Sequence, residues 1–281
     1  MEVLKLDSIE LKYQVVGRGE PVLLIHCGLI ADAFVPVFGE QELVRSYELI
    51  HYHRYGYGGS THSDRQVSIA DQASHSRALL ENLGIERCHV VGHSYGGLIA
   101  LQLVLEAPEY VASLALLEPA FVLPSEAKPT VPLPEGVRLY AAGQKRAAVD
   151  FFLRAMLGAD YRGLMEHRLP PGAYETAVND IDTLFLVEAA ARGEWNFTRA
   201  DAARITQPAF SIVGADSAAP HQRRHRMTLD LLPHAEAFSV AHANHGLPIM
   251  EPKAVADGLR NFFLRYPMAR GIESKISINP L

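Results

Sequence analysis

Cysteine is scarce in this sequence, with Cys27 and Cys88 the two examples in 281 residues. Two cysteines in apolar contexts exclude a disulfide framework and indicate a reducing compartment. The N-terminus lacks a basic start followed by a long apolar run, so we expect no signal peptide. No stretch approaches the ~18 consecutive apolar residues that a membrane span requires. We therefore expect a cytoplasmic protein that has no membrane partner.

A surplus of positive charge is also missing. The formal net charge of −6 argues against nucleic acid or an anionic membrane surface as the main partner. The sequence contains no dinucleotide-binding or phosphate-loop pattern, so we expect no cofactor. The pairs His51/His53 and His221/His225 have spacings that place both members on one face, but no third ligand is evident, and we expect no metal. A small-molecule acyl substrate remains the expected partner, and a homo-oligomer is compatible with the sequence.

Apolar runs typical of buried strands alternate with helical patterns over most of the chain. The segments 2–6 and 9–16 predict a hairpin at a sheet edge. Strands are expected near residues 22–26, 47–52, 88–91, 111–117, 208–213 and 235–240. Helices are expected near residues 69–83, 98–107, 220–232 and 252–265. This alternation predicts an α/β fold with a mostly parallel central sheet flanked by helices.

The alternation stops between residues 121 and 205, where no buried-strand run occurs. This segment begins with a proline-rich stretch and continues with helical patterns at 143–157 and 174–191. We therefore predict core residues 1–120, an inserted helical cap at 121–205, a second core part at 206–267 and a tail at 268–281. Cap residues expected to line an apolar substrate pocket are Phe151, Phe152, Phe185 and Trp195.

The most informative motif is Gly-x-Ser-x-Gly at residues 92–96, centred on Ser94. It lies between an apolar run and a helical pattern, where a strand turns sharply into a helix. Glycines at 92 and 96 relieve the crowding of such a turn, and the turn exposes the serine hydroxyl. In parallel sheets the binding and catalytic residues lie at the carboxyl ends of the strands, and this turn follows such an end.

A serine hydroxyl needs a base, and the base needs an orienting carboxylate. On a strand–turn–helix fold the expected chain order is serine, acid, histidine. Asp216 and His245 follow later strands in that order, and Gly246 with the downstream Glu-Pro pair favours His245 over His242. Glu118, at the end of an earlier strand, is the alternative acid. We prefer Asp216, although the choice stays open.

These motifs resemble the α/β-hydrolase family, in the variety with an inserted cap, over residues 9–120 and 206–266. Further landmarks are the loop 26–29 and the glycine-rich loop 54–60. The resemblance implies Ser94 as nucleophile, His245 as general base, and an oxyanion hole. The hole would use the backbone N–H groups of Tyr95 and of Gly28. Cys27 replaces a family glycine, and we interpret it as a small buried thiol.

The expected function is a serine hydrolase that cleaves ester or related acyl substrates through an acyl-enzyme. A nucleophilic serine argues against the relatives that open epoxides or displace halide. Carbon–carbon bond hydrolysis, perhydrolysis or cofactor-free oxygenation with the same residues are alternatives. A receptor that binds a signal molecule and retains these residues is a further alternative. The sequence does not separate them.

Overall fold

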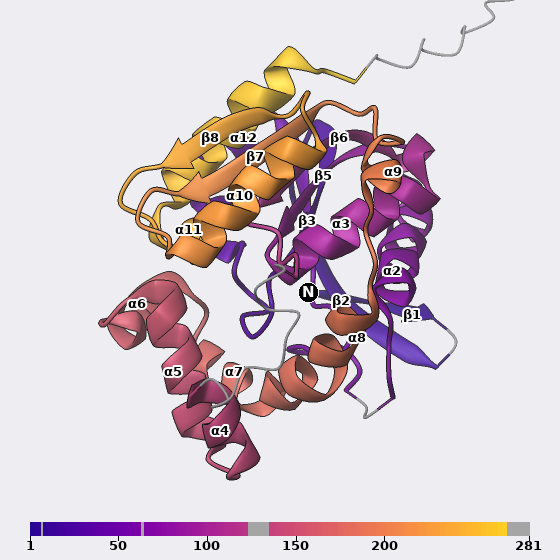
Figure 1. Cartoon of the computed structure of the whole chain (residues 1–281). Helices are drawn as coiled ribbons and strands as arrows, with labels where there is room; N and C mark the ends of the chain where they lie inside the picture. Colours follow the sequence, from indigo (N-terminus) through magenta and orange to yellow (C-terminus); the bar gives the residue numbers. More distant parts are fainter. Residues whose placement is uncertain (7, 63–64, 123–134, 269–281) are drawn as a thin grey trace, which may run out of the picture.

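The protein is built around one eight-stranded sheet in the order β1-β2-β4-β3-β5-β6-β7-β8 (Figure 1). This computed structural model describes residues 1–6, 8–62, 65–122 and 135–268. The strands are β1 (Glu2–Leu6), β2 (Ile9–Gly17), β3 (Glu20–Ile25), β4 (Tyr47–Tyr52), β5 (Cys88–His93), β6 (Val111–Leu117), β7 (Ala209–Gly214) and β8 (Glu236–Val240). β1 and β2 pair antiparallel, as does β2 with β4, and all other neighbours pair parallel. The predicted hairpin, strand positions and mostly parallel sheet are confirmed.

Helices cover both faces of the sheet because its central strands are apolar on both sides. Every residue of β5, β6 and β7 is buried. One face carries α2 (Ile69–Asn82), α3 (Tyr95–Glu106) and α10 (Ala219–Leu231). The other carries α1 (Gln41–Val44), α11 (Leu247–Met250) and α12 (Pro252–Arg265), with the short 3₁₀ helix η1 (Val35–Gly39). Another short 3₁₀ helix, η2 (Pro108–Tyr110), precedes β6.

Between β6 and β7 the described chain is mainly helical, and residues 135–194 lie beyond the carboxyl ends of the strands, whereas residues 199–202 lie beside α2 on the core (Figure 1). The helices here are α4 (Glu135–Ala141), α5 (Lys145–Leu157), α6 (Tyr161–Arg168), α7 (Ala173–Asp182), α8 (Ala189–Glu194) and α9 (Arg199–Ala202), with the π-helical turn η3 (Thr183–Glu188) between α7 and α8. We call this set the inserted helices. Their apolar residues, such as Leu153 and Ile181, pack against Leu29 and Ile30 of the loop after β3.

Parts of the predicted organisation lie outside the described residues. Most of the proline-rich stretch falls in 123–134, and nearly all of the predicted tail falls in 269–281. The expected helices at 143–157 and 174–191 correspond to α5 and to the continuous run from α7 to α8. In the described part of the chain, no helix combines the length and the apolar character needed to cross a membrane.

Candidate active site

Loops after six parallel strands meet at one edge of the sheet, and they carry the predicted site residues. Ser94 follows β5, Glu118 follows β6, and His245 lies in the loop after β8. Gly28 follows β3 on the other side of Ser94 in the strand order. Residues separated by up to 151 positions are thereby brought into contact. The strand order, rather than any local pattern, is what assembles this edge.

Ser94 sits at the apex of the turn between β5 and α3 with a φ of +55° and a ψ of −115°. This left-handed conformation is strained for a residue with a side chain. A Cβ at position 92 would lie 2.5 Å from the carbonyl oxygen of Gly96. A Cβ at position 96 would overlap the backbone of Ile25 and His26 in and after β3. The two glycines therefore permit the close packing that holds the serine in this position.

The Ser94 hydroxyl lies 3.0 Å from His245 Nε2, and His245 Nδ1 lies 2.5 Å from Glu118 Oε2. A carboxylate accepts hydrogen bonds, so His245 donates from Nδ1 and its Nε2 is left to accept the hydroxyl proton. Ser94 is half-buried and lines a cavity, whereas Glu118 is fully buried. The three groups form one hydrogen-bonded array from the cavity to the protein interior.

Glu118 is fixed by several donors and by its own backbone. Its Oε1 accepts from the backbone N–H of Gly214 at 2.8 Å and from the hydroxyl of Ser217. Its φ of +45° places it among the few non-glycine residues of left-handed conformation in the described chain. Buried carboxylates need such donors to offset the loss of hydration. The carboxylate is thus held ready to orient His245.

The preference for Asp216 as the partner of His245 is corrected by the structure. Glu118 makes this contact, while Asp216 is exposed in the loop after β7 and its backbone N–H bonds to Ala243. The next residue in that loop, Ser217, turns inward and donates to Glu118 instead. The loop after β7 therefore supplies a hydroxyl rather than a carboxylate. Glu118 is the alternative acid predicted from the sequence, and it is the one that lies within hydrogen-bonding distance of His245.

His245 itself is held by a second histidine. His93 Nε2 donates to the backbone oxygen of His245 at 2.8 Å, and both imidazoles are buried. Burial and the positive charge of Arg224 lower the pKa of His245 below its usual value. Burial likewise lowers the pKa of His93 to about 3. His242, the competing histidine, is exposed at the surface.

A third imidazole, that of His221 at the start of α10, stacks on His245. The ring centroids are 3.9 Å apart and the ring planes differ by 23°. His221 Nδ1 lies 3.3 Å from Glu118 Oε2, the same oxygen that contacts His245. In the sequence, His221 stands out only through its helical spacing to His225. No local pattern connects His221 to a loop that lies more than twenty residues further along the chain.

The Ser94 hydroxyl opens into a cavity of about 550 Å³ between the strand ends and the inserted helices. Both predicted oxyanion residues, Gly28 and Tyr95, line this cavity. Tyr95 is the first residue of α3, so its backbone N–H belongs to the positive end of that helix. Of the four predicted aromatic lining residues, Phe152 and Phe185 line the cavity.

The other two predicted lining residues lie elsewhere. Phe151 is 39% exposed. Trp195 stacks on Phe121 and Phe197, and its indole N–H donates to Gln102 at 2.8 Å. Phe152 faces inward because successive residues on a helix point in directions about 100° apart, so its neighbour Phe151 points elsewhere.

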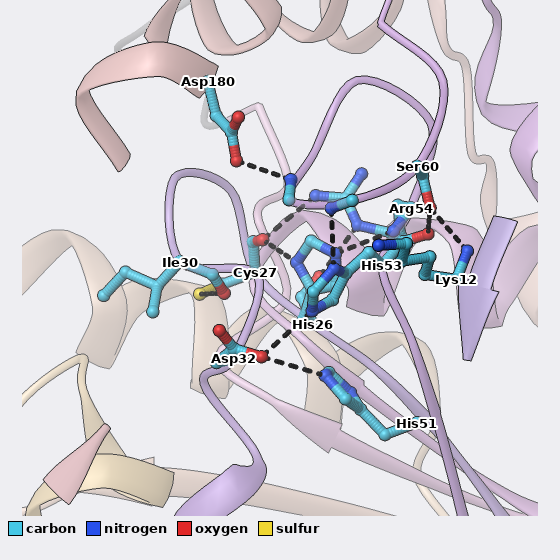
Figure 2. A network of polar contacts seen from close by, with 12 residues as sticks. Lys12, His26, Cys27, Ile30, Asp32, His51, His53, Arg54, Ser60 and Asp180 are labelled. Atoms are coloured by element: carbon cyan, nitrogen blue, oxygen red, sulfur yellow. Dashed lines mark hydrogen bonds and ion pairs between the residues drawn. The ribbon is translucent and has the colours of Figure 1, made fainter. Parts of the chain in front are cut away.

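Arg54, which begins the glycine-rich loop, binds the loop that carries Gly28. Its guanidinium donates to the carbonyl oxygens of His26 and Cys27 at 3.1 and 3.0 Å (Figure 2). It also pairs with the buried carboxylate of Glu188, from η3, at 2.5 Å. Because Glu188 lines the cavity, the inserted helices reach the backbone next to Gly28 through one buried ion pair. Glu188 is not among the residues that the sequence predicts for the site, since nothing local distinguishes it from a surface glutamate.

Cys27 lies in the loop that Arg54 holds. It is 1% exposed, and burial raises the pKa of its thiol to about 12. Its sulfur faces the backbone oxygen of Ile30 (Figure 2). A protonated, enclosed thiol is a weak nucleophile, in agreement with the interpretation as a small buried residue.

The structure adds a carboxylate to each of two histidine groups, but neither arrangement suits a metal ion. Asp32 Oδ1 lies 2.9 Å from His53 Nε2 and 4.0 Å from His51 Nε2 (Figure 2). His53 Nδ1 accepts from the Gly59 N–H, so neutral His53 carries its proton on the nitrogen that a metal would need. In the group of Glu118, His221 and His245, the Nδ1 of His245 carries the proton that it donates to Glu118, and its Nε2 faces the hydroxyl of Ser94, so both nitrogens of that ring are already engaged.

A mostly parallel sheet with a serine on its strand–helix turn is the architecture of the alpha/beta hydrolase fold. The family model of that fold matches residues 20–252, and the chain belongs to this family. The "Putative carbamate hydrolase RutD" of Pseudomonas syringae pv. syringae is 26% identical over 80% of this chain and 86% of its own length.

Other similarities cover less of the chain or concern the fold alone. The dihydrolipoyllysine-residue acetyltransferase component of the acetoin cleaving system from Cupriavidus necator is 36% identical over 115 residues, which is 41% of this chain and 30% of that protein. The enol-lactonase from Burkholderia xenovorans LB400 has a TM-score of 0.77 at 20% identity, covering 94% of this chain and all of that one. Naproxen esterase from Bacillus subtilis has a TM-score of 0.73 at 22% identity, covering 93% and 90%.

Proposed function

We propose that the protein is a serine hydrolase that cleaves esters or related acyl compounds through an acyl-enzyme. The observation that carries the proposal is the continuous array of Ser94, His245 and Glu118, with contacts of 3.0 and 2.5 Å. In the first half-reaction His245 Nε2 takes the proton of Ser94, whose oxygen forms a bond to the acyl carbon. The imidazolium then returns that proton to the leaving group as the acyl–oxygen bond breaks.

In the second half-reaction a water molecule takes the place of the leaving group. His245 removes a proton from this water, the hydroxide oxygen attacks the acyl carbon, and Ser94 regains its proton as it departs. Glu118 stays ionised throughout and stabilises the imidazolium that forms twice in the cycle. The acid product then leaves through the cavity, whereas the alcohol has already left before the water molecule entered.

The backbone N–H groups of Tyr95 and Gly28 are proposed to bind the oxyanion of each tetrahedral intermediate. Tyr95 contributes from the positive end of α3, and Gly28 from the loop that Arg54 fixes. Loss of one such donor typically lowers the rate by ~10²–10³-fold. Arg54 is in this scheme a positioning residue, because it contacts the backbone beside Gly28 and not the reacting atoms.

The substrate class is proposed to be small to medium acyl compounds, with the inserted helices acting as a cap. Support comes from the cavity volume of about 550 Å³ and from its apolar lining residues, including Met156 and Leu184. The names of similar proteins, among them a carbamate hydrolase, an enol-lactonase and an esterase, describe related hydrolytic reactions.

Labelling with a fluorophosphonate tests the proposal directly. The wild-type protein is expected to form one covalent adduct at Ser94, and Ser94→Ala is expected to form none. Mass spectrometry of the labelled protein locates the adduct. A wild-type protein that resists the reagent, or an adduct that persists in Ser94→Ala, would contradict the assignment of the nucleophile.

A further inference from the structure

His221 is placed against the proposed base in two independent ways. Its ring stacks on that of His245, and its Nδ1 approaches the oxygen of Glu118 that His245 uses. It enters from α10, whereas His245 enters from the loop after β8 and Glu118 from the end of β6. One carboxylate oxygen therefore faces two imidazoles at 2.5 and 3.3 Å.

A single carboxylate balances a single positive charge. In the proposed reaction His245 becomes an imidazolium, and Glu118 stabilises that charge. A proton on His221 would place a second cation on the same carboxylate, with ring centroids 3.9 Å apart. Like charges at such a separation oppose each other strongly. The reaction therefore requires His221 to be neutral.

The two imidazoles differ in exposure. The side chain of His221 is 23% exposed and that of His245 is 8% exposed. Water stabilises the charged form of an imidazole, so the more exposed ring accepts a proton at lower cost. Other charged or titratable groups near the pair are Arg224 and His225 on α10 and His93 on β5, and Glu188 of η3 and Arg192 of α8 line the same cavity. Arg224 disfavours a proton on His245.

We propose that His221 is a positioning residue whose neutral ring holds His245 in place and whose protonation switches the base off by taking over Glu118. As the pH falls, the first proton goes to His221, and the acid limb of the reaction reports that event. Because the two rings share one carboxylate, the measured midpoint belongs to the pair. This inference rests on the proposed function, since it concerns the activation of Ser94.

The test follows the rate of fluorophosphonate labelling of Ser94 between pH 4 and 9 in the wild type, His221→Phe and His221→Ala. Phenylalanine keeps a ring against His245 but cannot be protonated. We expect its acid limb to move to lower pH by about one unit. Alanine is expected to show the same shift and also a lower plateau, since His245 loses the stacked ring.

His225→Phe is the matched control, because His225 lies one turn further along α10 and bonds to Ser211 rather than to Glu118. Its acid limb is expected to coincide with that of the wild type. An unchanged limb in His221→Phe, with normal labelling on the plateau, would overturn the inference and leave the proposed function intact. An unlabelled wild type would instead remove the proposed function itself.

Discussion

Two groups, each made of one carboxylate and two histidines, lie at the same edge of the sheet and differ in the atoms that they contact. Glu118 with His221 and His245 is one, and Asp32 with His51 and His53 is the other. In each, one carboxylate oxygen approaches two imidazoles. The first group lines the cavity and reaches Ser94, whereas the second lies on the far side of β3 and is absent from that lining.

In each group one histidine is hydrogen-bonded to the carboxylate, and the groups differ in what its other ring nitrogen contacts. His245 presents its Nε2 to the hydroxyl of Ser94, a group that can react. His53 presents its Nδ1 to the backbone N–H of Gly59, a group that cannot. A carboxylate–histidine pair is therefore proposed as a base in one place, whereas in the other it anchors a loop. Residue types alone identify histidines that could pair with a carboxylate. The atom that faces the other ring nitrogen then indicates whether such a histidine can react or only anchors the backbone.

The largest expected effect comes from removing the charge of Glu118. Glu118→Gln should lower kcat/KM by ~10³–10⁴-fold, because the amide does not hold His245 in the required tautomer or stabilise its imidazolium. Asp216→Asn is the matched control and is expected to behave as the wild type, since Asp216 is exposed. Esterase kinetics at pH 8 provide the measurement. Equal losses in the two variants would contradict the assignment of the acid.

The second group should affect stability instead. His51 is fully buried, and burial lowers its pKa to about 3. Its folded-state pKa lies below the unfolded value of about 6.5, so the unfolded state takes up the proton first as the pH falls. Stability is therefore present above pH 6.5 and is lost from there down to about pH 3.

His51→Leu removes this proton uptake. Between pH 7 and pH 5 the free energy of unfolding should fall by about 2 kcal/mol less in the variant than in the wild type. Urea unfolding at the two pH values measures the difference, which cancels packing effects common to both. His234→Leu, at an exposed position, is the control and should match the wild type. Identical pH dependence in all three proteins would refute this account of His51.

The smallest expected effect is that of Asp32→Asn on the rate at which Ser94 is labelled. Asp32 contacts His53 and does not line the cavity, so the rate of Ser94 labelling should equal that of the wild type. Its loss should appear in the unfolding transition, since the carboxylate anchors the loop after β4 through His53. A large loss of labelling in a folded Asp32→Asn protein would mean that the two groups are not separate in role.

The sequence determined much of the fold because its signals are local. Alternating apolar runs and helical patterns located the strands and helices, and the glycines around Ser94 marked the turn that carries it. Ser94 and His245 each follow a parallel strand, which places both at one edge, since parallel strands end on the same side. These features depend on neighbours within a few residues.

Only the tertiary structure decided which carboxylate contacts His245 and which second histidine approaches that same carboxylate. Glu118 reaches Gly214 across 96 positions and His245 across 127, and Arg54 reaches Glu188 across 134. Such contacts depend on the packing of β6 against β7 and of the inserted helices on the loops. Asp216 and Glu118 both end a strand in the sequence, and their different directions follow from backbone conformations that composition does not encode.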